Sequence, residues 1–215
     1  MIISIDGPAG SGKSTIAELV SRKLNFIHFH AGSLYRGITA YLIDQFSEFS
    51  NLNVLILPKI KLKTEFIDGV QRVFVNEKDY TDKLRDNAVS INSPLISSFP
   101  KTRKIVDDCQ REFAKSHNLV IDGRDIGSFV FPNAEYKFYL DCDIKERAKR
   151  RFNEEKQKNI NITLKEIENQ LALRDKIDKE KKLAPLVVPE NAIVIDSTNL
   201  TIDEVVNIIL SHVSV

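Results

Sequence analysis

Short apolar runs alternate along this chain with segments in which apolar residues recur every three or four positions. The first run, Ile2–Ile5, ends at a glycine as a buried parallel strand does, and a helical stripe through Ile16, Val20 and Leu24 follows it. The other runs typical of strands are Phe26–Phe29, Leu119–Ile121, Tyr136–Leu140 and Ala192–Ile195. Further helical stripes cross Ile105–Phe113 and Val205–Leu210. Strands that alternate with helices predict an α/β fold with a five-stranded parallel sheet.

Two stretches depart from this alternation. Within Ile38–Pro100, Lys63–Ile67 and Arg72–Val75 flank Asp68-Gly69, which predicts a small β-hairpin in an insertion at one edge of the sheet. Residues Lys145–Lys182 contain no glycine and carry 13 Lys and Arg against 8 Asp and Glu, a local excess of five positive charges. The second stretch predicts exposed helices, which form either an ordinary solvated surface or a cationic functional face.

Composition narrows the class of protein. The 215 residues, 42% of them hydrophobic, suffice for one domain with an insertion and argue against disorder. The net charge of +1 gives no global attraction to nucleic acid or membrane, and no apolar run reaches the length of a bilayer span. Cys109 and Cys142 are expected to be free thiols. The start of the chain lacks a signal-peptide pattern. We therefore expect a cytoplasmic protein, and we expect it to be a monomer.

One segment carries a specific chemical pattern. Residues Gly7–Ser14 read Gly-Pro-Ala-Gly-Ser-Gly-Lys-Ser, which matches G-x-x-x-x-G-K-[ST] between a strand and a helix. Backbone N–H groups can surround a phosphate chain only where side chains are absent, as the three glycines allow. Lys13 adds a positive charge that follows the transferred group, and Ser14 offers a hydroxyl to Mg²⁺. The pattern predicts binding of a nucleoside triphosphate with Mg²⁺ by Gly7, Pro8, Ala9, Gly10, Ser11, Gly12, Lys13, Ser14 and Thr15.

A phosphate loop leaves the class of reaction open. The strings N-K-x-D and D-x-x-G, which GTPases use, do not occur, and a motor ATPase needs more chain. A small kinase needs in addition a site for its acceptor and a cationic lid that keeps water out. A nucleotide sensor or assembly factor that does not turn over is the alternative from another class.

Charged residues follow two of the predicted strands at the sheet edge where ligands bind. Arg36 comes after the second strand, and Arg124 and Asp125 come after Leu119–Ile121. Two guanidinium groups from adjacent strand ends can bind one phosphate dianion, although either residue alone could be an ordinary surface arginine. Asp122, at the end of its strand, suits a carboxylate that holds magnesium-bound water.

A third group of arginines lies in the glycine-free stretch. Arg147, Arg150 and Arg151 are spaced i, i+3 and i+4, which places them on one helix face. An arginine cluster without paired acids is unusual for a structural role and suits the clamping of a transferring phosphate. The four histidines, His28, His30, His117 and His212, show no ligand spacing and are interpreted as ordinary core or surface residues.

Several segments together resemble one family. They are Ile5–Pro8, Gly32–Arg36, Phe99–Arg103, Asp122–Gly127, Val130–Ala134, Glu146–Arg151, Arg174–Asp175, Leu183–Leu186 and Asp196–Thr198. Over nearly its whole length the chain resembles the bacterial cytidylate kinases, which are P-loop nucleoside monophosphate kinases. The resemblance implies a three-layer P-loop fold with a core of residues 1–37, 101–144 and 183–215. It further implies an insertion that binds the nucleoside monophosphate at 38–100 and a helical lid at 145–182.

The resemblance also implies a reaction and roles. The γ-phosphoryl group of ATP would pass to CMP or dCMP, giving CDP or dCDP and ADP. Lys13, Arg147 and Arg151 would be catalytic, with Arg150 as a further candidate. The implied acceptor contacts are Arg36 and Arg124 to the phosphate, Arg103 and Asp125 to cytosine, and Arg174 and Asp178 to the ribose. The chemistry fits, because a carboxylate accepts from the cytosine 4-amino group while a guanidinium donates to O2 and N3.

The chain departs from the family pattern at three places. Ala31 stands where the family has Ser or Thr. The family's cytosine-contacting serine aligns with Pro94, or with Ser93 if the register shifts by one. Lys181 or Lys182 replaces an arginine at the end of the lid and loses its bidentate fork. These departures concern base selectivity and acceptor affinity, so UMP, AMP and non-nucleotide acceptors stay open as alternatives.

Overall fold

The computed structural model describes residues 1–46, 59–157 and 162–214. Residues 47–58 of the predicted insertion and 158–161 of the predicted lid lie outside these ranges. The chain divides into two compact units. The first consists of Met1–His28 and Asn118–Val215, and the second of Phe29–His117. Each unit has its own architecture.

The first unit is built on a parallel sheet with the strand order β2-β6-β1-β7-β8. Its strands are β1 (Ile2–Asp6), β2 (Ile27–His30), β6 (Leu119–Asp122), β7 (Tyr136–Asp141) and β8 (Ile193–Asp196), and the chain passes into the second unit within β2. β1 pairs in parallel with β6 on one side and β7 on the other, and β7 pairs in parallel with β8. The predicted α/β fold and its five-stranded sheet are confirmed.

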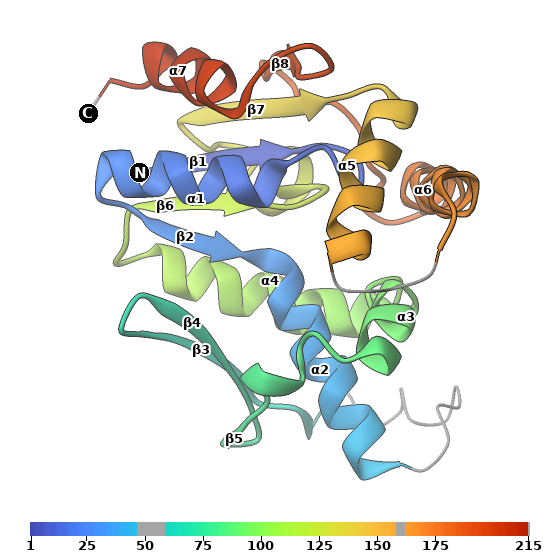
Figure 1. Ribbon diagram of the computed structural model, residues 1–215. Helices are drawn as coiled ribbons and strands as arrows, with labels where there is room; N and C mark the ends of the chain where they lie inside the picture. Colours follow the sequence, from blue (N-terminus) through green and yellow to red (C-terminus); the bar gives the residue numbers. More distant parts are fainter. Residues whose placement is uncertain (47–58, 158–161, 215) are drawn as a thin grey trace. The chain divides into compact units, whose positions relative to one another are not determined.

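Two helices cover one face of this sheet. They are α1 (Lys13–Leu24) and α7 (Ile202–His212), and Figure 1 shows α1 running along β1 and β6. Val20 of α1 and Ile209 of α7 are fully buried in one core cluster with Ile5 and Phe138 from the sheet. The helical stripes predicted from the sequence therefore face the sheet, because burial of such a stripe supplies most of a helix's stability in a protein.

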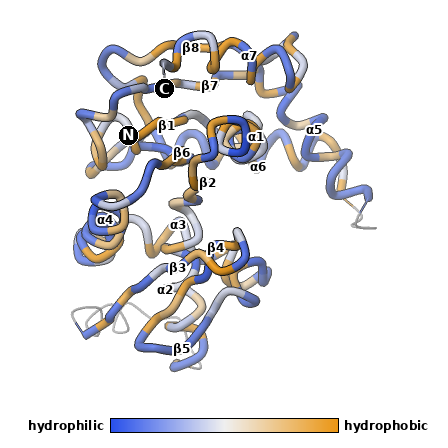
Figure 2. Tube along the Cα trace, turned by 90° about the vertical axis from the view of Figure 1, so that its left-hand side faces the viewer, coloured by the Kyte–Doolittle hydropathy of each residue, from blue (hydrophilic) through white to orange (hydrophobic). Residues whose placement is uncertain are grey.

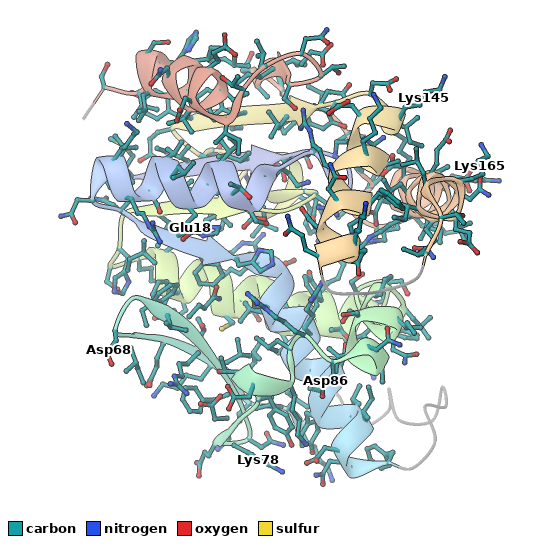
Figure 3. The ribbon with its side chains drawn as sticks, in the orientation of Figure 1. Glu18, Asp68, Lys78, Asp86, Lys145 and Lys165 are labelled. Carbon is teal, nitrogen blue, oxygen red and sulfur yellow. The ribbon has the colours of Figure 1, made fainter. Side chains whose placement is uncertain are left out.

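The charged stretch of the first unit forms two helices, α5 (Ile144–Gln157) and α6 (Leu164–Glu180). Figure 1 shows both beyond the arrowheads of β1 and β7, the end of the sheet at which the phosphate loop begins. The tube of α5 in Figure 2 is largely hydrophilic. Figure 3 labels Lys145 and Lys165, which are exposed on α5 and α6. A small cluster that includes Ala148, Ile167 and Leu171 packs the two helices together beside Ala9.

The second unit contains the predicted hairpin. Its helices are α2 (Ala31–Gln45), α3 (Asn87–Ile96) and α4 (Pro100–Ala114), with the short helix η2 (Thr81–Lys83). Its strands β3 (Leu62–Ile67), β4 (Val70–Val75) and β5 (Lys78–Asp79) form an antiparallel sheet. Asp68 and Gly69 turn the hairpin with positive φ values of 52° and 76°, as a two-residue hairpin loop requires.

This division groups α2 and α4 with the insertion in one unit. The division into core, insertion and lid at residues 38–100 and 145–182 stays a prediction. Cys109 and Cys142 are free thiols, as predicted. In the described part of the chain, no helix combines the length and the apolar character that a membrane crossing requires.

Candidate active site

The phosphate loop connects β1 to α1 in the first unit, and its backbone requires glycine. A Cβ at Gly7 would lie 2.2 Å from the carbonyl oxygen of Leu140, so β7 leaves no room for a side chain there. Gly12 has a φ of 91° and is the N-cap of α1, a left-handed conformation that other residues adopt only with strain. The loop thus presents backbone N–H groups and the positive end of α1 to a ligand.

Lys13 is folded into this loop and is only 5% exposed. Its Nζ donates to the carbonyl oxygen of Pro8 at 2.5 Å and to Ser11 Oγ at 3.2 Å. Burial, together with the charge of Arg124, lowers the pKa of Lys13 well below its usual value. Phosphate oxygens bound in the loop would stabilise the charged form of Lys13 and raise its pKa again, so the lysine favours an anionic ligand.

Ser14, the first hydroxyl of α1, lies next to the end of β6. Its Oγ donates to Asp122 Oδ2 at 2.6 Å, and the other carboxylate oxygen lies 2.9 Å from His28 Nε2. Ser14 and Asp122, each predicted separately at the magnesium site, are therefore hydrogen-bonded to each other in this unit. His28 is a site neighbour that the sequence interpretation missed, because a single histidine in a short strand carries no local signal of its partner.

The loop after β6 is held by a second carboxylate. Asp6, fully buried at the end of β1, accepts from the backbone N–H of Ile126 at 2.8 Å and of Gly127 at 2.7 Å. These residues begin a π-helical turn, Ile126–Val130, a rare element that is frequent at functional sites. Asp125, 8% exposed, immediately precedes the turn. Asp6 was also missed, although an acid that ends a buried apolar run is a usable signal.

Arg124 is held by an acid from α6. Its Nε donates to Asp178 Oδ2 at 3.1 Å, and Lys181 Nζ donates to Asp178 Oδ1 at 2.8 Å. Burial opposes ionisation of Asp178, but the charges of Arg124 and Lys181 outweigh it and hold its pKa below the usual value. Lys181 is thus tied to the acid predicted to contact the ribose.

Arg147 lies at the junction of α5, α6 and the phosphate loop. It is 5% exposed, and its Nη2 lies 2.7 Å from Asp175 Oδ2. Its Nη1 donates to the carbonyl oxygen of Ala9 and its Nε to the carbonyl oxygen of Cys142, each at 2.9 Å. Asp175 also accepts from the N–H of Ala9 at 3.3 Å. The buried ion pair therefore binds both backbone groups of one phosphate-loop residue.

The expectation that the three arginines of α5 lack acidic partners is wrong. Besides the Arg147–Asp175 pair, Arg150 lies 3.6 Å from Glu146, and Arg151 lies 2.9 Å from Glu155. Arg150 also donates to the carbonyl oxygen of Ser197 at 2.7 Å. These acids stand four or 28 positions away, and only folding shows which of them an arginine meets.

The acceptor residues predicted from the second unit lie on α2 and α4. Arg36 donates to the carbonyl oxygen of Leu84 at 3.2 Å. Arg103, 3% exposed in the first turn of α4, places its guanidinium carbon 5.9 Å from the centre of the Tyr35 ring. A cation over an aromatic face in a buried setting is a favourable contact. The planar guanidinium is therefore held in a defined orientation within this unit.

The remaining predicted residues have simpler surroundings. Arg174 is exposed on α6. Ala31 is the first residue of α2 and is 4% exposed. Of the two residues that could align with the family's cytosine-contacting serine, Ser93 donates its hydroxyl to the carbonyl oxygen of Val89. The other, Pro94, lies inside α3 and has no hydroxyl. The predicted contacts of all these residues with an acceptor stay predictions.

A glycine loop between a parallel strand and a helix, with a buried lysine and an arginine–carboxylate network around it, defines a P-loop nucleotide-binding protein. The model of the family described as cytidylate kinase matches residues 3–215. A cytidylate kinase from Fusobacterium nucleatum is 39% identical over 97% of this chain and 95% of its own length. A cytidylate kinase from Halalkalibacterium halodurans is 41% identical over 99% of this chain and 97% of its own length. The chain belongs to the cytidylate kinase family.

Membership makes the protein a kinase of nucleoside monophosphates with ATP as phosphate donor. Among solved structures, an uncharacterized protein from Eubacterium ventriosum aligns with a TM-score of 0.51 at 12% identity, covering 99% of this chain and 97% of that one. That similarity concerns the fold alone.

Proposed function

We propose that the protein transfers the γ-phosphoryl group of ATP to CMP or dCMP, with Mg²⁺, giving CDP or dCDP and ADP. The observation that carries the proposal is the loop Asp122–Gly127, which holds in one segment Asp122, Arg124 and Asp125, the residues predicted for the magnesium site, the acceptor phosphate and the base. The family names of the relatives, cytidylate kinase, support the choice of acceptor.

The acceptor's own phosphate oxygen would attack the γ-phosphorus, so no side chain has to act as a nucleophile. Catalysis is then positioning together with neutralisation of charge. Lys13 would follow the transferring group, and Arg147 and Arg151 would act from the lid. Arg150 would be a third lid arginine. Its Nη1 lies close to the phosphate loop, 4.0 Å from where a Cβ on Gly12 would be. Arg147 meets the phosphate loop through Ala9, so in this role it would orient the loop as well as carry charge.

The residues at the metal position fit a magnesium ion. Ser14 commits its hydroxyl hydrogen to Asp122, which leaves the Oγ lone pairs available to a hard cation that prefers oxygen ligands. Ser14 would bind the ion and Asp122 would hold its water. When bound, Mg²⁺ neutralises charge on the β- and γ-phosphates.

The base would be read by Asp125 and Arg103. Uracil presents a carbonyl and an N–H where cytosine presents an amino group and N3, so this pair would be mismatched with uracil. Each mispaired contact is worth roughly 1–3 kcal/mol of discrimination. Arg36 and Arg124 would bind the acceptor phosphate, and Arg174 and Asp178 the ribose hydroxyls.

Steady-state phosphorylation of CMP, dCMP, UMP and AMP in parallel, with ATP and Mg²⁺, tests the proposal. We expect CMP and dCMP to exceed the other acceptors in kcat/KM by about ten-fold or more. Equal rates with UMP would remove the base-reading roles of Arg103 and Asp125 while keeping the kinase. No phosphorylation of any of the four would reject the proposed acceptor class.

The same proposal includes a monomer in the cytoplasm that binds no nucleic acid. The nearly balanced charge of the chain supports the absence of nucleic-acid binding, since a net charge of +1 provides no field for a polyanion.

A further inference from the structure

Three side chains from different parts of the first unit form a continuous hydrogen-bonded chain. His28 Nε2 of β2 lies 2.9 Å from Asp122 Oδ1, and Asp122 Oδ2 accepts from Ser14 Oγ at 2.6 Å. β2 and β6 are neighbours in the sheet, which brings the histidine alongside the last residue of β6. The Asp122 side chain is 3% exposed and that of His28 21%. This series of hydrogen bonds ends at the hydroxyl of Ser14, in the first turn of α1.

The direction of each hydrogen bond follows from the chemistry of the groups. An ionised carboxylate only accepts, so His28 Nε2 carries the hydrogen. A serine hydroxyl has a single hydrogen, and here it is given to Asp122. With one carboxylate oxygen held by the imidazole, the other has one orientation toward Ser14. The lone pairs of Ser14 Oγ are thereby left to accept from, or to bind, another group.

We propose that His28 is a positioning residue for magnesium–ATP, which holds Asp122 so that Asp122 orients the Ser14 hydroxyl for the metal. The inference rests on the magnesium part of the proposed function. Groups that hydrogen-bond to the acids around a metal site fix the geometry of the ligands, and their loss costs about 10–100-fold in metal affinity or activity.

A structural role for His28 makes a different prediction. If the ring only fills space at the edge of the sheet, an apolar side chain of similar size preserves nucleotide binding with and without Mg²⁺. If the Nε2 donor is needed, the loss appears only in the magnesium-dependent part of ATP binding. A side chain that places an N–H donor at the same distance then restores the magnesium-dependent part of ATP binding.

Four variants separate these roles. His28→Leu removes the donor and keeps apolar volume. His28→Gln keeps an N–H donor at a reach close to that of Nε2, while His28→Asn is one methylene shorter. His212→Leu, a change of an exposed histidine on α7 in the same unit, is the matched control. The measurement is calorimetric binding of ATP with and without Mg²⁺, in the absence of any acceptor, together with the melting temperature.

We expect His28→Leu to reduce the gain in ATP affinity from Mg²⁺ about ten-fold, with metal-free ATP binding unchanged. His28→Asn should behave like His28→Leu, and His28→Gln and His212→Leu should stay within about three-fold of the wild type. If His28→Leu does not fold, the contrast between His28→Gln and His28→Asn carries the test. A wild-type magnesium gain in the folded His28→Leu or His28→Asn protein would overturn the proposal.

A double-mutant cycle tests the route through Ser14. Ser14→Ala removes the end of the chain, so His28→Leu added to Ser14→Ala should cause no further loss of the magnesium gain. An undiminished further loss would show that His28 acts elsewhere and would overturn the inference. Because no acceptor is present, a failure of the CMP assignment leaves these results untouched. Absence of any magnesium gain in the wild type would instead reject the magnesium site itself.

Discussion

At the scale of single residues, the site is a set of charges that protein atoms already compensate. Lys13 donates to Pro8 and Ser11, and Arg124 and Lys181 share Asp178. These contacts preorganise the groups, because the side chains have little freedom left to lose when a phosphate binds. Substrate would then replace weak partners such as a carbonyl oxygen with anionic ones.

Replacement of Lys13 by alanine tests its catalytic role. We expect Lys13→Ala to lower kcat by about 10²–10³-fold or more, because a preorganised charge at the transferring group is lost. The readout is ADP release in the presence of CMP, with circular dichroism to show that the fold is intact. Lys23→Ala, an exposed lysine at the other end of α1, is the control. A folded Lys13→Ala protein with near-normal turnover would contradict the catalytic role of Lys13.

Asp125 carries the prediction for base recognition. We expect Asp125→Ala to raise the KM for CMP about ten-fold or more, since a contact to the base edge is worth roughly 1–3 kcal/mol, and to change the KM for ATP little. Initial rates with each nucleotide varied in turn give both constants. Equal increases for the two nucleotides would mean that Asp125 acts on the fold of its loop and not on the base.

At the scale of elements, the first unit ties its helices to its loops through buried polar contacts. α5 and α6 meet the phosphate loop through Arg147 and Asp175 at Ala9, and β1 holds the π-helical turn through Asp6. Each contact fixes a loop to a regular element of the unit.

The Arg147–Asp175 pair makes a stability prediction. Asp175→Ala leaves a buried guanidinium without its acid, which costs about 3–5 kcal/mol in the free energy of unfolding. Glu154→Ala, which removes an exposed acid 4.0 Å from Arg151, should cost under about 1 kcal/mol. Urea unfolding of both variants measures the two costs. Similar values would show that burial of the Arg147 pair contributes nothing special.

At the scale of the whole molecule, the protein combines a parallel-sheet unit that carries the phosphate loop with an α+β unit that carries Arg36 and Arg103. The core of the first unit is apolar, yet Asp6 is placed within it at zero exposure. A single buried carboxylate of this kind affects the stability of the unit as a function of pH.

Burial raises the pKa of Asp6 to about 7, and the hydrogen bonds from Gly127 and Ile126 offset part of the rise. In the unfolded chain the pKa is about 4. Between these values the folded state keeps a proton that the unfolded state releases. The stability contributed by Asp6 is therefore complete below about pH 4, and it is lost as the pH rises through about 7.

Asp6→Asn removes this dependence. We expect the wild type to lose unfolding free energy relative to Asp6→Asn between about pH 4 and pH 7, and the difference to be constant at higher pH. Urea unfolding across that range gives the difference directly, and Asp108→Asn, an exposed aspartate of α4, controls for the loss of a carboxyl group. A difference that does not vary with pH would contradict the prediction.

The five strands of the parallel sheet, the hairpin, the main helical stripes, the phosphate loop and the family could be predicted from the sequence, because these depend on local periodicity and on residues that are adjacent in the chain. The partners of the arginines and the contact between His28 and Asp122 could not. His28 and Asp122 are 94 positions apart, Asp6 and Ile126 are 120, and Ala9 and Asp175 are 166. These contacts arise only on folding, since sheet order and helix packing bring together groups whose spacing along the chain carries no signal.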